Sequence, residues 1–158
     1  MSVDKRPEPD RWSNLYGARR RVIACATVIE EMRPFLPADV SYEVLEFGLH
    51  LKPQELKRVL QEKIDEASQQ TDVVILGYGL CSMAVVGLKA TRCTLVVPRV
   101  DDCIAILYGS YKTYRDQFDA APGTYYLTKG WLESGSNPLD EYHSYIEKYG
   151  EEQAIWLM

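Results

Sequence analysis

Two stretches decide the fold: Asp72-Val-Val-Ile-Leu-Gly-Tyr-Gly-Leu-Cys81 and Leu95-Val-Val-Pro-Arg-Val-Asp-Asp-Cys103. Each begins with a short apolar run and continues into polar or glycine-rich residues that carry a cysteine, and a helical pattern follows. Such a run without alternation is typical of a strand that is covered on both faces of a parallel sheet. A residue suited to binding or chemistry therefore follows the carboxyl end of each predicted strand.

Two earlier segments repeat this design, because Val22–Ala24 leads to Cys25 and Tyr42–Leu45 leads to His50. Strands that alternate with helical segments indicate an α/β fold. We therefore expect a mainly parallel, Rossmann-like sheet of about five strands with helices on both faces. The predicted strands are residues 20–24, 41–47, 71–76, 93–97 and 124–128.

The most regular helical pattern follows Pro53, where apolar residues three, four or seven apart form one stripe. Thr27-Val-Ile-Glu30 has the form of a capping box, which predicts a helix start just beyond Cys25. Further helices are predicted at residues 82–88, from Asp101 or Asp102 to about 118, and at 138–149.

Length and composition favour one domain, residues 19–158, after an N-terminal arm of residues 1–18. The apolar end, Ala154–Met158, suggests that the natural chain extends beyond Met158 or that this tail packs against a partner. A net charge of −5 without a broad basic face argues against nucleic-acid binding. No apolar run approaches the ~20 residues of a membrane span, and the N-terminus lacks a signal peptide. We therefore expect a cytoplasmic protein.

Cysteine and histidine residues define the candidate site. Because parallel strands end at one edge of a sheet, Cys25, His50, Cys81 and Cys103 are predicted to converge there. Thiolates and imidazole are good zinc ligands, and an iron–sulfur cluster or another transition metal would also accept them. The alternative is that the three cysteines are small buried apolar residues, which is the role expected of Cys93.

Other functions fit the same residues. A metal-free thiol enzyme would use a cysteine at a helix N-terminus, Cys103 or Cys25, with the histidine as base. An accessory binding protein would hold a closed structural site instead. The turn Gly77-Tyr78-Gly79 is a candidate cofactor-binding element, although it lacks a third glycine and a P-loop lysine, and a tight turn also explains it.

Five short motifs together resemble the domain-of-unknown-function 1638 family over residues 20–158. They are Ile23-Ala-Cys25, Gly48-Leu-His50, Gly77-Tyr-Gly-Leu-Cys81, Asp101-Asp-Cys103 and Pro122-Gly-Thr-Tyr-Tyr-Leu-Thr128. The resemblance implies a site shared by Cys25, His50, Cys81 and Cys103. It implies no established activity, but it suggests one-carbon metabolism and a corrinoid methyltransferase system as partner. The small-molecule substrate and the oligomeric state are left open.

Overall fold

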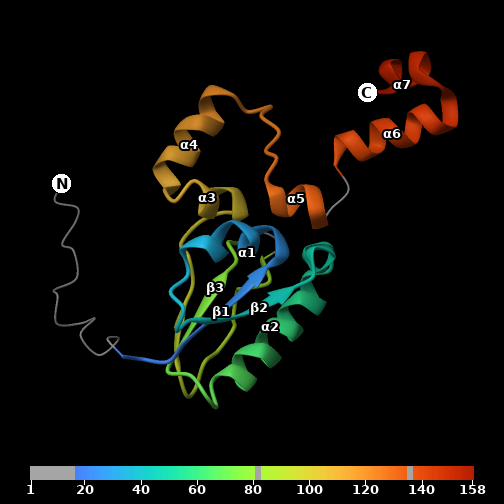
Figure 1. The fold of residues 1–158 in the computed structure, drawn as a ribbon. Coiled ribbons are helices and arrows are strands. Elements are labelled where there is room, and N and C mark those ends of the chain that lie inside the picture. The colour runs from blue at the N-terminus through green and yellow to red at the C-terminus, as the bar shows by residue number, and fades with distance from the viewer. Residues whose placement is uncertain (1–16, 81–82, 135–136) are drawn as a thin grey trace.

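The computed structural model describes residues 17–80, 83–134 and 137–158. Within these residues, the centre of the fold is a sheet of four parallel strands in the order β2-β1-β3-β4 (Figure 1). The strands are β1 (Arg20–Cys25), β2 (Ser41–Leu45), β3 (Val73–Gly77) and β4 (Thr94–Val96). The predicted mainly parallel α/β class is confirmed.

Helices cover both faces of the sheet because its two central strands are apolar on both faces. The helix α2 (Pro53–Ala67) buries Leu56, Leu60 and Ile64 against the face that carries Ile23 and Leu76. The helix α1 (Ala26–Met32) buries Ile29 against Val22 and Ala24 on the opposite face. The apolar stripe predicted after Pro53 is therefore the stripe that α2 buries.

The remaining elements lie between these helices and beyond the sheet. Two short 3-10 helices, η3 and η4, flank β2, and α3, α4 and α5 follow β4 on the side of the strands' carboxyl ends (Figure 1). Their bounds are η3 (Arg33–Phe35), η4 (Phe47–Leu51), α3 (Cys103–Leu107), α4 (Tyr111–Ala120), α5 (Lys129–Ser134), α6 (Pro138–Tyr149) and α7 (Glu151–Leu157).

The prediction of a fifth strand at residues 124–128 is wrong, because this segment pairs with no strand in the described part of the chain. Its aromatic residues serve another purpose. The ring of Tyr126 packs edge-on against Tyr108 with their centroids 5.8 Å apart, and Tyr125 and Leu127 are exposed. The segment is thus an extended connection that is held by side-chain packing.

The predicted helix starts and lengths also need correction. The single helix predicted up to residue 118 is two helices, since Gly109 takes a positive φ of 66° and Ser110 caps α4. Residues 84–87 form turns in place of the helix predicted at 82–88, whose first residue lies outside the described residues. The capping box is absent, because α1 begins at Ala26 and Thr27 is buried in its first turn.

The helix α5 docks tightly on α1. A Cβ added to Gly130 would lie 2.7 Å from the Cα and from the carbonyl oxygen of Thr27, which is closer than carbon atoms approach without displacement. Glycine at this position lets the two backbones touch. The docking places Trp131 beside the carboxyl ends of the strands.

The C-terminal helices α6 and α7 pack against each other and stand apart from the sheet (Figure 1). Asn137 caps α6, since its side-chain oxygen accepts hydrogen bonds from the N–H groups of Leu139 and Asp140. Trp156 on α7 is 86% exposed. None of the described helices combines the length and the apolar character that crossing a membrane requires.

Candidate functional site

A cavity of about 440 Å³ opens at the carboxyl ends of β1 and β3. These two strands are neighbours, yet the chain leaves β1 toward β2 on one side and later returns as β3 on the other. Such a reversal of direction is the point where open α/β sheets commonly bind ligands. The residues that line the cavity are Cys25, Thr27, Phe47, His50, Pro53, Gly77, Tyr78, Asp102, Cys103, Ile104 and Trp131.

Cys25 is held at the junction of β1 and α1. It is the last residue of the strand and the N-cap residue of the helix, and it is 8% exposed. The Thr27 hydroxyl donates a hydrogen bond to its Sγ over 3.4 Å. The sulfur therefore has a fixed polar neighbour at the cavity wall.

His50 lies in η4 with its ring orientation set by the backbone. Its Nδ1 lies 2.5 Å from the carbonyl oxygen of Phe47. Because a carbonyl oxygen only accepts, Nδ1 carries the hydrogen in this contact, and in the neutral ring Nε2 keeps its lone pair. The Phe47 ring packs on the imidazole with centroids 4.5 Å apart. The neutral ring can therefore act as a ligand or as a base through Nε2.

Asp102 and Cys103 form the start of α3. Asp102 caps this helix through a 3.0 Å hydrogen bond from the Ala105 N–H to Oδ1, and its Oδ2 accepts a 2.7 Å hydrogen bond from the Tyr114 hydroxyl. This bond to Asp102, together with burial, raises the pKa of Tyr114 to about 12. Both carboxylate oxygens are thus bound, and the charge of Asp102 is fixed at the cavity wall.

Replacing Tyr114 with phenylalanine is expected to lower the free energy of unfolding by about 1.5 kcal/mol at pH 8, because a hydrogen bond to a charged group is lost. In the folded chain the pKa of Tyr114 is about 12, above its ordinary value near 10. The unfolded chain therefore loses the Tyr114 proton at a lower pH than the folded chain does. The stability of the wild-type chain should therefore fall as pH rises from about 10 to about 12. Urea unfolding of both proteins across this range measures the difference. A slope that is unchanged in Tyr114→Phe would contradict the assignment.

The loop after β3 approaches this helix start closely. A Cβ on Gly79 would lie 2.8 Å from the Cα of Asp102, and the Leu80 N–H donates a hydrogen bond to the Val100 carbonyl over 3.0 Å. Gly77 and Tyr78 line the cavity, whereas Gly79 is not among its lining residues. Close approach to the Asp102 backbone accounts for Gly79, and the Ala24 Cβ, 2.4 Å from where a Cβ on Gly77 would lie, accounts for Gly77. A role of this turn in cofactor binding stays a prediction.

Three of the four predicted ligands, Cys25, His50 and Cys103, line this one cavity. The fourth, Cys81, lies outside the described residues. Among the described residues, no three His, Cys, Asp or Glu side chains are grouped so that they could hold a metal ion as they stand. Cys93, which was expected in the core, is half-buried and packs against the core on the α2 side. The role of the four residues as metal ligands stays a prediction.

Sequence reasoning missed the aromatic walls of the cavity. Phe47 from η4 and Trp131 from α5 meet edge-on with centroids 5.1 Å apart. The available signal was Thr128, whose hydroxyl accepts a hydrogen bond from the Trp131 N–H three residues later, as in a helix cap. That pattern marks a helix start, but it does not reveal which surface the helix covers.

Residues 44–158 match the family model described as protein of unknown function (DUF1638), which is more than two-thirds of the chain. The chain belongs to this family. The matched part of this DUF1638 protein contains β3, β4, His50 and Cys103, whereas Cys25 precedes it. No curated protein and no solved structure matches the chain. Membership of the family therefore assigns no activity to this cavity of the DUF1638 protein.

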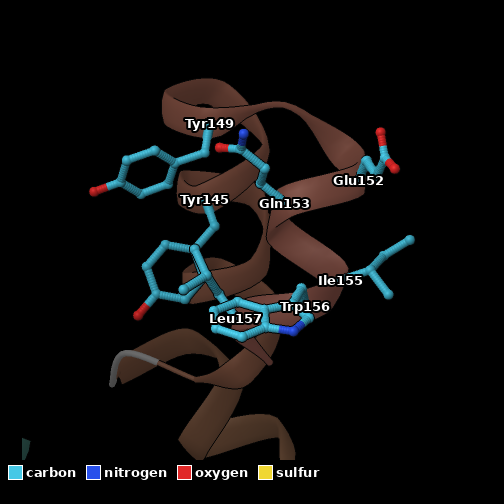
Figure 2. A pocket seen from close by; sticks show the side chains of 7 residues that line it. All are labelled: Tyr145, Tyr149, Glu152, Gln153, Ile155, Trp156 and Leu157. Carbon is cyan, nitrogen blue, oxygen red and sulfur yellow. The ribbon is translucent and has the colours of Figure 1, made fainter.

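A larger hollow, of about 1260 Å³, lies on the hairpin of α6 and α7. Figure 2 shows the rings of Tyr145 and Tyr149 from α6 on the same side as Trp156 from α7, with Ile155 pointing away from them. Among the described residues, those that line this hollow include no cysteine and no histidine, and Glu152 is the only charged one. We place the candidate site of the DUF1638 chain at the smaller cavity, since reactive side chains and the strand ends meet there.

Proposed function

We propose that this chain binds a transition metal, zinc in the first instance, through Cys25, His50, Cys103 and Cys81. One observation carries the proposal. Three residues with ligand side chains, from loops far apart in the sequence, line a single cavity at the reversal point of the sheet. Two thiolates, one imidazole and one further cysteine match the donor atoms of zinc sites.

The surroundings of the three residues support this role. Metal-binding histidines usually donate their second ring N–H to a carbonyl or carboxylate, and His50 Nδ1 has such a partner in the Phe47 carbonyl. The Thr27 hydroxyl donates a hydrogen bond to the Cys25 sulfur, which gives this ligand a polar partner beside the cavity. Binding requires the side chains to turn toward a common point, and a cysteine needs only one torsion angle for this.

The inclusion of Cys81 has support from the preceding residue. The Leu80 N–H donates to the carbonyl of Val100, three residues before Cys103 in the sequence. The two loops that carry these cysteines therefore run beside each other as far as residue 80. The chemistry that zinc supplies when bound is Lewis acidity toward water or a substrate thiol.

A zinc-binding assay with matched cysteine variants tests the proposal. We expect about one zinc per chain in untagged, anaerobically prepared protein. Cys25→Ser, Cys81→Ser and Cys103→Ser should each weaken zinc binding by more than about 100-fold in competition with a chelating dye. Cys93→Ser is the control, because Cys93 is not among the residues that line the cavity. It should bind zinc like the wild-type protein.

Two results would overturn the zinc site. One is less than about 0.2 metal per chain in the wild-type protein, and the other is an equal loss of affinity in Cys93→Ser. The alternative thiol enzyme predicts a different pattern, in which iodoacetamide labels Cys25 or Cys103 preferentially and added zinc gives no protection. The cytoplasmic location, the link to one-carbon metabolism and the corrinoid methyltransferase partner stay predictions of the sequence and of the family resemblance.

A further inference from the structure

Three aromatic residues line the cavity that holds the proposed zinc site. Phe47, Tyr78 and Trp131 line it, and they come from η4, the loop after β3 and α5 respectively. Phe47 is the common neighbour, since its ring lies 4.5 Å from that of His50 and 5.1 Å from that of Trp131, centroid to centroid. Aromatic rings present a negative face that attracts cations.

The described residues that line the cavity give it a negative charge. Asp102 is the lining residue with a formal charge at neutral pH, and neither lysine nor arginine occurs among the described residues that line the cavity. Its carboxylate cannot turn away easily, because the Ala105 N–H and the Tyr114 hydroxyl hold its two oxygens. An anionic ligand would meet this fixed negative charge without a compensating cation. A cationic ligand would be attracted by it.

From these two features we propose that the cavity binds a small organic cation with apolar substituents, of the quaternary ammonium class. Rings from three elements would contact the alkyl groups, while Asp102 would balance the charge. A cavity of about 440 Å³ is within the range of small-molecule sites. The inference deepens the proposed function, because it assigns a ligand to the cavity of the proposed zinc site. It does not require zinc, although bound thiolates would add negative charge.

Choline and its neutral carbon isostere, in which a tert-butyl group replaces the trimethylammonium group, form the first test. Isothermal titration calorimetry on the full chain should show choline binding, with an affinity at least about tenfold higher than that of the isostere. The isostere has the same shape but lacks the charge, so the ratio isolates the electrostatic attraction. Equal affinities, or an absence of choline binding at about 50 mM, would overturn the proposal.

Matched variants locate the binding site. Trp131→Leu and Phe47→Leu should each weaken choline binding about tenfold, and Trp131→Tyr should retain most of the affinity because it keeps an aromatic face. Phe35→Leu is the control, since Phe35 is 85% exposed and does not line the cavity. Circular dichroism confirms that each variant is folded. An equal loss in Phe35→Leu would place binding elsewhere and refute the assignment.

Titrations with and without zinc separate this inference from the proposed function. Choline binding by chelator-treated protein supports the cation site even if the zinc assay fails. Zinc binding without choline binding supports the metal site and refutes the cation site. In a background with Trp12→Phe and Trp156→Phe, the fluorescence of Trp131 gives a second readout, and choline should change its intensity. An unchanged signal at saturating choline would contradict contact with Trp131.

Discussion

Gly77→Ala is expected to lower the free energy of unfolding by about 3 kcal/mol, as measured by urea denaturation. Gly77 ends β3 and pairs with Ala24 in β1, at the centre of the sheet. A Cβ on Gly77 would lie 2.4 Å from the Cβ of Ala24 and 3.2 Å from its Cα. Both strands are buried under α1, where Val28 lies 3.4 Å from the same position, so neither strand can move away without disturbing the core.

The double variant Ala24→Gly with Gly77→Ala isolates this contact. It moves the single Cβ from one strand to the other and removes the closest of the unfavourable contacts. Glycine in a strand costs roughly 1 kcal/mol, so the double variant should not recover fully. We expect it to be at least about 1 kcal/mol more stable than Gly77→Ala alone. Strictly additive losses would show that the Ala24 methyl group does not cause the destabilisation.

Local sequence patterns determine the central part of this fold. Continuous apolar runs predicted β1 and β3, and the stripe of Leu56, Leu60 and Ile64 predicted α2, because burial against a sheet requires those patterns. The segment at 124–128 failed for the opposite reason. Its tyrosines have high strand propensity, but Tyr126 is used in packing against Tyr108, and propensity does not distinguish the two uses.

The candidate site was predictable where it depends on topology alone. Cys25, His50 and Cys103 follow strands that end at one edge of a parallel sheet, so the alternation of strands and helices was sufficient to group them. Phe47 and Trp131 were not predictable in this way. Trp131 reaches the cavity because α5 docks on α1, a contact between residues about 100 positions apart that leaves no periodic signal.

This docking leads to the second large effect. Gly130→Ala is expected to lower the free energy of unfolding by about 2 kcal/mol and to loosen α5. Alanine improves helix propensity by roughly 1 kcal/mol, which alone would stabilise the chain. The new Cβ, however, would lie 2.7 Å from the backbone of Thr27, which cannot rotate away like a side chain. The steric cost should therefore exceed the gain in propensity, and α5 should shift from α1.

Gly123→Ala is the matched control, because no atom of the described residues lies within 4 Å of the Cβ it would add and its φ is not positive. Its unfolding free energy should stay within about 0.5 kcal/mol of that of the wild-type chain. Relative to the wild-type chain, Gly130→Ala should accelerate hydrogen exchange more at the amides of residues 129–134 than at those of α2. The reason is that the substitution displaces α5 locally. If exchange accelerated equally in α2, the contact between Gly130 and Thr27 would stabilise the sheet and its helices as well as α5, which carries Trp131. If Gly130→Ala were instead more stable than the wild-type chain, helix propensity would outweigh the contact, and α5 would not be held against α1 as described.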